Sequence, residues 1–172
     1  LTVIDDAEKM IRKREPGFSM DAVPYDDQRV YAMLNAGETE GVFQMESGGM
    51  TQAVMGLQSK SLEDIIAIIS LYRPGPMESP TYIANRHNPG NVKYKTPQLE
   101  HILDVTNGCI VYQEQVMQIC RELAGFSYGQ ADLVRRAMSK KKHDVMEKER
   151  QHFVHGNTEP GHECAGCVAN GI

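Results

Sequence analysis

The architecture can be read most directly from YQEQVMQICRELAGFSYGQADLVRRAMSKKK, residues 112–142. Apolar side chains recur there at the i, i+3, i+4 and i+7 spacing of an amphipathic helix, and a glycine follows in the position after the C-cap. A capping box then opens a second helix, which carries a basic cluster. The residues concerned are Val116, Ile119, Cys120 and Leu123 in the first helix, Gly125 at its end, and Ser127 with Gln130 in the box.

Helix signals continue toward the N-terminus. Ser61 followed by Asp64 resembles another capping box, and the apolar run LEDIIAIISLY, residues 62–72, predicts a buried helix. Thr96 before Pro97 predicts a helix start, an apolar stripe follows at 99, 102 and 103, and Asn107-Gly108 predicts the end. Further expectations are helices at 3–13 and 26–36, short strands at 41–44 (GVFQ) and 109–112 (CIVY), and a rigid turn at 72–77 (YRPGPM). The sequence therefore predicts a mainly α fold with a few short strands.

Composition places the chain among globular proteins. It has 172 residues, of which 41% are hydrophobic and 24% charged, and this predicts a single domain over residues 1–172. The longest apolar run, IIAII at 65–69, is far shorter than the roughly 20 residues of a membrane span. Residues 1–20 lack the apolar core of a signal peptide, and four cysteines are too few for a secreted disulfide scaffold. We therefore expect a cytoplasmic protein with reduced thiols and no membrane partner.

The segment LVRRAMSKKK, residues 133–142, carries five positive charges and no negative one in a chain of net charge −5. An acidic chain can contact phosphates only through such local clusters. If one helix runs through the segment, Arg135, Arg136, Ser139 and Lys142 share a side, whereas Lys141 points to the apolar side. A solvated helix face usually interleaves both signs, so the pattern favours phosphate recognition over a solvated face.

The C-terminal segment contains half of a zinc-ligand pattern. Cys164 and Cys167 are spaced as a CxxC pair with His162 beside them, and His155 is a further candidate ligand. Structural zinc sites usually combine two well-separated pairs of nitrogen or sulfur ligands, and the second pair is missing here. A polar, glycine-rich loop with two metal-free thiols is the favoured interpretation.

Two other motifs point to helix starts. Ser47 in ESGGM lacks the glycine that a nucleophile elbow places two residues earlier, where Met45 stands, so a helix cap is favoured. The adjacent Asp5 and Asp6 project about 100° apart on a helix, which favours stabilisation of a helix N-terminus over metal binding. Two hypotheses remain: a substrate-binding part of a phosphoryl or nucleotidyl transfer enzyme, and a small helical nucleic-acid- or protein-binding module, with or without zinc.

Five strings together resemble the bacterial DNA polymerase III alpha subunit family, the C-family of replicative polymerases. They occur in order, at compatible spacings, over nearly the whole chain. Ser139, where the family often has glycine, and Met45, where other apolar residues are usual, are small departures. The strings are GVFQMESGGM (41–50), LYRPGPM (71–77), NGCIVYQEQVMQI (107–119), LAGFSYGQADLVRRAMSKKK (123–142) and CVANGI (167–172).

The resemblance implies a DNA-directed DNA polymerase, a nucleotidyltransferase of DNA replication, of which this chain is the N-terminal part of the fingers region. In this family the catalytic aspartates and their Mg²⁺ ions belong to the palm, N-terminal to the matched region. The resemblance thus implies no catalytic residue and no metal ligand in this chain, and an inactive fragment. The implied partners are a DNA primer-template, deoxynucleoside triphosphates, and other replicase subunits that bind outside this region.

The resemblance also assigns the basic cluster. It implies that the fingers bind the triphosphate of the incoming nucleotide through Arg135, Arg136, Lys140 and Lys142. It places three residues of the YQEQ string near the nascent base pair or DNA: Tyr112, Gln113 and Gln115. A structural alternative stays open for these three, because Tyr112 ends a predicted strand and Gln115 can stabilise the helix start. Arg73 is a weaker candidate for contact with template or nucleotide phosphate.

Overall fold

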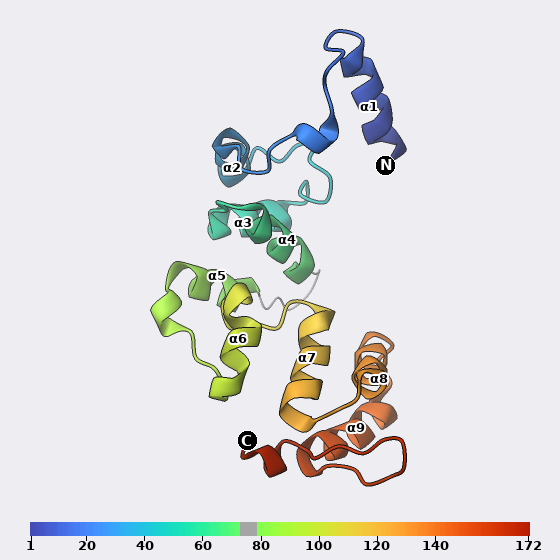
Figure 1. The fold of residues 1–172 in the computed structure, drawn as a ribbon. Helices are drawn as coiled ribbons and strands as arrows, with labels where there is room; N and C mark the ends of the chain where they lie inside the picture. The colour runs from blue at the N-terminus through green and yellow to red at the C-terminus, as the bar shows by residue number, and fades with distance from the viewer. Residues whose placement is uncertain (73–78) are drawn as a thin grey trace. The chain divides into compact units, whose positions relative to one another are not determined.

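The computed structural model describes residues 1–72 and 79–172, and the fold is mainly α, as predicted. The chain divides into two compact units, Leu1–Ile65 and Ile66–Ile172, which are described separately (Figure 1). The described residues contain no named strand, and their β pairing is limited to one antiparallel bridge between Asn157 and Cys164. The segment 73–78, which includes Arg73 and most of the predicted turn, lies outside the described residues.

The first unit is built from short helices with side-chain caps. Asp27 caps α2 by accepting a hydrogen bond from the Arg29 backbone N–H at 2.9 Å. Ser47 caps α3 through the Met50 N–H at 3.3 Å, which confirms the predicted cap. The elements are α1 (Thr2–Arg12), the 3₁₀ turn η1 (Met20–Ala22), α2 (Gln28–Asn35), α3 (Gly48–Leu57) and the start of α4 (Leu62–Leu71).

α1 is a surface helix without a buried residue. Its two adjacent acids form ion pairs on the helix surface: Lys9 lies 2.5 Å from Asp5 and 3.8 Å from Asp6. Such exposed i, i+3 and i, i+4 pairs contribute only a few tenths of a kcal/mol each, roughly 0.3–0.5. Asp5 lies in the first turn of α1, where a negative charge stabilises the helix dipole, as the sequence predicts.

The predicted strand at 41–44 is wrong. The chain forms consecutive turns there, with positive φ values of 75° at Gly41 and 65° at Gln44. The Met45 N–H donates to the Val42 carbonyl at 2.9 Å, which closes one of these turns. A strand needs extended residues and a partner strand, and neither is present in this part of the chain.

α4 begins as predicted but is less completely buried than its sequence suggests. The Asp64 N–H donates to Ser61 Oγ at 3.3 Å, and the Asp64 carboxylate in return accepts the Lys60 N–H at 2.9 Å. Ile68 is fully buried, whereas Ile66 is 45% exposed. The prediction of a buried helix therefore does not hold at Ile66.

The second unit holds the remaining helices, and α7, α8 and α9 pack against one another. Pro97 begins a 3₁₀ turn that leads into α6, and the predicted apolar stripe of Leu99, Ile102 and Leu103 is buried. The elements are α5 (Ser79–His87), η2 (Pro89–Asn91), η3 (Pro97–Leu99), α6 (Glu100–Leu103), η4 (Asp104–Thr106), α7 (Gln113–Ala124), α8 (Tyr128–Ser139), α9 (His143–His155) and η5 (Val168–Asn170).

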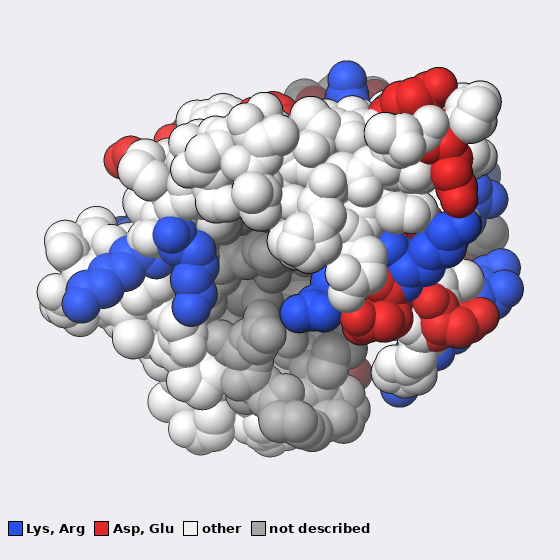
Figure 2. Space-filling view, turned by 90° about the horizontal axis from the view of Figure 1, so that it is seen from below, with Lys and Arg blue, Asp and Glu red and all other residues white. Residues whose placement is uncertain are grey.

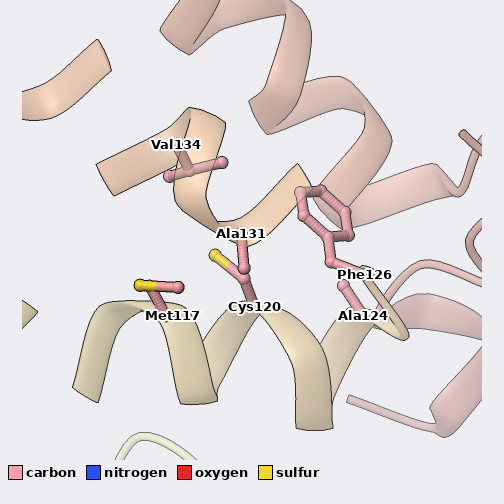
Figure 3. Packing of buried hydrophobic residues seen from close by; sticks show 6 residues of the cluster. All are labelled: Met117, Cys120, Ala124, Phe126, Ala131 and Val134. Atoms are coloured by element: carbon pink, nitrogen blue, oxygen red, sulfur yellow. The ribbon is translucent and has the colours of Figure 1, made fainter. Parts of the chain in front are cut away.

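α7 is the central helix of this unit because it contributes residues to two apolar clusters. One cluster joins α7 to α8 across the Gly125 turn, and Figure 3 shows the Cys120 side chain of α7 directed at Ala131 of α8. The other joins α7 to α6 and to the C-terminal segment. The first consists of Met117, Cys120, Ala124, Phe126, Ala131 and Val134; the second of Leu99, Ile102, Leu103, Leu123 and Cys167.

The predicted strand at 109–112 is also wrong. The segment follows two left-handed residues, Asn107 (φ 53°) and Gly108 (φ 78°), and has no partner strand among the described residues. A side chain replaces that partner: Gln115 Oε1 accepts the N–H groups of Val111 at 2.9 Å and Tyr112 at 3.0 Å. The apolar run is therefore an irregular segment held by the first turn of α7.

The segment after α9 returns to the C-terminal end of α7 and completes it. The Gly166 N–H donates to the Ala124 carbonyl at 3.0 Å, and Asn170 Nδ2 donates to the Leu123 carbonyl at 2.7 Å. These are carbonyls that the helix itself leaves unpaired at its end. The return path passes Gly156 so closely that a side chain at Gly166 would collide with the backbone there.

Candidate anion-binding site

α8 carries the basic cluster, and local signals fix where it begins. Ser127 Oγ accepts the Gln130 N–H at 3.3 Å, and Gln130 Oε1 accepts the Ser127 N–H at 2.9 Å, so the predicted capping box is confirmed. The helix buries one stripe of small apolar residues against its neighbours: Ala131, Val134 and Ala137. The charged side chains consequently lie on the remaining, more exposed surface.

The prediction of one helix running through Lys142 is wrong. α8 ends at Ser139, Lys140 is its C-cap, Lys141 is left-handed with φ 51°, and Lys142 is the N-cap of α9. The Lys142 N–H donates to the Ala137 carbonyl at 3.0 Å and the Lys141 N–H to the Met138 carbonyl at 3.2 Å, a pattern of the Schellman type.

This turn changes the geometry of the lysines. All three are exposed, so Lys141 does not lie on an apolar face as predicted. A signal for the turn was present in the sequence, because no apolar residue occurs between Met138 and Val145 to continue the buried stripe. The cations therefore project from a corner between two helices and do not form one line.

Arg135 is tied to two neighbours. Its Nε donates to Asp132 Oδ1 at 2.8 Å, its Nη2 lies 2.7 Å from the same oxygen, and its Nη1 donates to Gln113 Oε1 at 2.9 Å. The side chain is 31% exposed. Arg135 thus connects α8 to the first residue of α7, and it brings Gln113 of the YQEQ string together with the basic cluster.

Arg136 makes a single contact of this kind. Its Nε lies 3.0 Å from Asp132 Oδ2, and its side chain is 56% exposed. In the described part of the chain its terminal amino groups meet no partner. Because a guanidinium has five N–H donors, Arg136 retains donors that a bound anion can accept.

Asp132 is the residue that the sequence analysis overlooked. Its carboxylate bridges both arginines, so the cluster is not free of acids. The signal was available, since Asp132 precedes Arg135 by three residues and Arg136 by four, the spacings at which helical side chains meet.

The YQEQ string forms the N-cap and first turn of α7. Tyr112 is half-buried at the N-cap of α7, and Gln113 is exposed. Gln115 is buried, and its Nε2 donates to the Ile102 carbonyl at 3.1 Å and to Thr106 Oγ1 at 2.7 Å. With its two acceptor contacts at 111 and 112, the Gln115 amide is fully used inside the fold, which supports the structural alternative for this residue.

Charge is arranged differently on α9. Arg150 lies 3.2 Å from Glu147, and Lys148 lies 3.7 Å from Glu159. Figure 2, which views the molecule from below, shows acidic and basic side chains side by side on its right-hand part. This interleaving is typical of a solvated surface. The contrast identifies the α8–α9 corner, with its three exposed lysines and the outer end of Arg136, as the candidate anion-binding site.

The cysteines of the C-terminal segment are free thiols that face backbone carbonyls. Cys164 Sγ lies 3.6 Å from the His152 carbonyl, and Cys167 Sγ lies 3.9 Å from the Val154 carbonyl. Burial raises the pKa of Cys164, which disfavours the thiolate that a metal requires. Among the described residues, no group of three or more His, Cys, Asp or Glu side chains could hold a metal ion.

We expect the purified chain to contain far less than one zinc ion per molecule, because Cys164 and Cys167 have no second ligand pair among the residues that the structure describes. Elemental analysis of protein prepared without chelator measures this directly, and Cys164→Ser should leave the zinc content unchanged. Stoichiometric zinc that disappears in the Cys164→Ser variant would contradict the expectation and favour a zinc-stabilised module.

Comparison with known proteins assigns this chain to a family. Residues 1–161 match the family model of the bacterial DNA polymerase III alpha subunit finger domain, and the chain belongs to that family. It is 54% identical over 144 residues to the DNA polymerase III subunit alpha of Staphylococcus epidermidis (strain ATCC 12228 / FDA PCI 1200), which is 83% of this chain and 14% of that protein. It is 51% identical over 153 residues to the DNA polymerase III subunit alpha of Staphylococcus aureus (strain MRSA252), which is 87% of this chain and 14% of that protein.

The chain therefore spans only about one seventh of the length of these relatives. The resemblance to the C-family polymerases drawn from the sequence is confirmed at the level of the family. Within the described ranges, every helix is too short or too polar to cross a membrane.

Proposed function

We propose that this chain is the N-terminal part of the fingers region of a replicative DNA-directed DNA polymerase, and that it binds the triphosphate of the incoming deoxynucleotide. The proposed ligands are Arg135, Arg136, Lys140 and Lys142. The observation that carries the proposal is the α8–α9 corner, where three exposed lysines at 140–142 follow Arg136, an arginine whose outer donors are unused by the described residues. Membership of the polymerase finger family supports it.

The chemistry explains why cations belong at this place. In nucleotidyl transfer the primer 3′ hydroxyl attacks the α-phosphate, and negative charge develops on the departing pyrophosphate. Arginine and lysine side chains that are already in position stabilise this charge without further rearrangement. Arg136 and the lysines of the corner supply such donors, and Arg135 holds the corner against α7.

The described residues do not fit a magnesium site, because no group of three or more His, Cys, Asp or Glu side chains is arranged to hold a metal. Mg²⁺ ions would supply electrostatic stabilisation of the reacting phosphate. In this proposal they belong to the palm of the complete polymerase, outside this chain.

The YQEQ string has a secondary place in the proposal. Tyr112 and Gln113 are proposed to lie near the nascent base pair or the DNA, and the bond from Arg135 to Gln113 links that position to the phosphate site. Gln115 acts through the fold, because its amide is buried and fully bonded. Arg73 remains a sequence-based prediction of a phosphate contact.

The proposed partners follow from this role. They are the DNA primer-template and deoxynucleoside triphosphates, with other replicase subunits bound through regions outside this chain. A cytoplasmic location is part of the same proposal. The small nucleic-acid- or protein-binding module is the less favoured alternative, because no described site supports a zinc centre for it.

The test uses the polymerase chain that contains this segment. Arg136→Ala should lower kcat/KM for the nucleotide by about ten- to a hundredfold, the effect of losing one charge-assisted contact to phosphate, roughly 1.5–3 kcal/mol. Arg135→Ala should show a loss of similar order, part of it from the broken link to Gln113. The affinity for primer-template should change far less in both variants, because the proposed contacts are to the triphosphate.

Arg150→Ala is the matched control, since Arg150 is an exposed arginine of the same unit whose charge is paired with Glu147. We expect its steady-state constants to stay within about twofold of the unaltered enzyme. Normal nucleotide efficiency with weakened DNA affinity in the Arg136→Ala enzyme would move the basic corner from the nucleotide to the duplex and contradict the proposal.

The purified 172-residue chain should show no primer extension. The reason is that the metal-binding aspartates expected in the palm are outside it, and two-metal catalysis needs that metal cage. Incorporation of labelled nucleotide is measured against a reaction without protein. Activity above that background would show that the segment holds a catalytic centre of its own.

A further inference from the structure

Asp132 connects the two arginines through a single carboxylate. Its Oδ1 accepts a hydrogen bond from Arg135 Nε and lies 2.7 Å from Arg135 Nη2, and its Oδ2 lies 3.0 Å from Arg136 Nε. The Asp132 side chain is only 26% exposed, so these contacts are partly shielded from water. We propose that Asp132 is a positioning residue for phosphate binding, which acts through Arg136 and is not itself a ligand; this inference rests on the proposed function.

The contact to Arg136 uses the inner part of the guanidinium. Because Asp132 engages Nε, the side chain is held near its base while the terminal amino groups have no partner in the described ranges. A free arginine side chain loses considerable rotamer entropy when it binds an anion. Holding Arg136 in advance reduces that loss and should therefore favour phosphate binding.

Arg135 anchors the same carboxylate. Its Nε, Nη1 and Nη2 are all engaged, two of them by Asp132 and the third by Gln113 of α7. Asp132 is therefore fixed in position by Arg135, which is bonded to α7. Because Asp132 also contacts Arg136, the packed α7–α8 pair restricts the movement of the Arg136 side chain.

A carboxylate beside a phosphate site has an opposing effect, because its charge repels the ligand. Here one negative charge is shared between two guanidinium groups, so the three side chains together keep a net positive charge. The lysines of the corner add to it. Because the cluster as a whole stays positive, we expect the positioning effect to exceed the repulsion.

The experiment compares Asp132→Asn, Asp132→Glu and Arg136→Ala in the polymerase chain that contains this segment. Asparagine keeps the size of the side chain but loses its charge, whereas glutamate can still reach residues three and four positions later. Asp132→Asn should raise the nucleotide KM about tenfold, with kcat and the primer-template Kd within about twofold, as expected for lost ground-state binding. Asp132→Glu should stay within about threefold of the unaltered enzyme.

The decisive measurement is the double variant. If Asp132 acts through Arg136, Asp132→Asn should add less than about a twofold effect when Arg136 is already alanine, because interacting residues are not additive. A general structural role for Asp132 would give the same tenfold loss in both backgrounds and would overturn the proposal. A lower nucleotide KM for Asp132→Asn would also overturn it, since repulsion would then dominate.

The same data separate this inference from the function on which it rests. If Arg136→Ala leaves both kcat and KM for the nucleotide unchanged, the phosphate site and the role of Asp132 are both wrong. If Arg136→Ala lowers kcat/KM for the nucleotide but Asp132→Asn does not, only the positioning role is wrong. Thermal melting of each variant shows whether a loss comes from unfolding, and we expect the melting temperature of Asp132→Glu to match that of the unaltered enzyme.

Discussion

Gly166→Ala should lower the free energy of unfolding of the chain by about 3 kcal/mol. A methyl group at this position would lie 2.3 Å from the Gly156 nitrogen, 2.7 Å from the His155 carbonyl carbon and 2.9 Å from the Val154 oxygen. All three are backbone atoms, so a rotamer change cannot relieve the collision. The left-handed φ of 78° adds strain of about 1–2 kcal/mol for any residue with a side chain.

The matched control for this prediction is Gly161→Ala. Gly161 is also left-handed, with φ 80°, but no atom lies within 4 Å of the added methyl group. Its variant should lose only the conformational part, about 1 kcal/mol. Urea denaturation followed by circular dichroism measures the free energy of unfolding of both variants. Equal losses would show that the collision with the backbone at Gly156 does not destabilise the fold.

Gln115→Leu should destabilise the chain by about 3 kcal/mol, although leucine suits a helix and a buried site. The change keeps similar volume but removes the amide that hydrogen-bonds four groups: the N–H groups of Val111 and Tyr112, the Ile102 carbonyl and the Thr106 hydroxyl. Of these, the Thr106 hydroxyl keeps its bond to the Cys109 carbonyl at 2.7 Å. An unsatisfied buried polar group costs roughly 1–3 kcal/mol, and water that enters the site would recover part of the total.

Gln118→Leu tests the same replacement on the exposed side of α7. Gln118 makes one side-chain bond, from Nε2 to Glu122 Oε1 at 2.8 Å. Its loss should change the free energy of unfolding by no more than about 0.5 kcal/mol. If both glutamine variants unfold at the same urea concentration, the buried network around Gln115 does not stabilise the fold as argued.

Elements with strong local signals were predictable from the sequence. The stripe at 116, 119, 120 and 123 and the capping box of Ser127 and Gln130 gave α7 and α8 with their ends nearly correct. These features depend on residues within one or two turns of each other. Periodicity and capping chemistry are sufficient when the interactions are so close in sequence.

The errors have a common physical origin. At 41–44 and 109–112, short apolar runs suggested strands, but a strand requires a distant partner that the sequence does not reveal. At 109–112 a glutamine side chain supplied the missing acceptor instead. At Lys141 a residue without special turn propensity took the left-handed conformation, because the C-terminal hydrogen bonds of α8 close there.

The basic residues of the candidate site were visible in the sequence, but their arrangement was not. The sequence indicated which cations gather, whereas the shape of the corner follows from the turn between α8 and α9. The bridging role of Asp132 was visible in its spacing to Arg135 and Arg136, yet spacing alone does not say which of several possible ion pairs forms. The bond from Arg135 to Gln113 joins residues 22 positions apart and depends on how two helices pack.

The return of the C-terminal segment to α7 has a consequence for the time course of folding. Asn170 and Leu123 are 47 residues apart, so the contact that completes α7 closes a long loop. Long-range contacts of this kind form slowly, since the entropy of loop closure must be lost before the contact is made. As the chain emerges during synthesis, α7 and α8 can pair early through their local cluster, but the end of α7 stays open to water until the segment with Gly166 and Asn170 has also appeared.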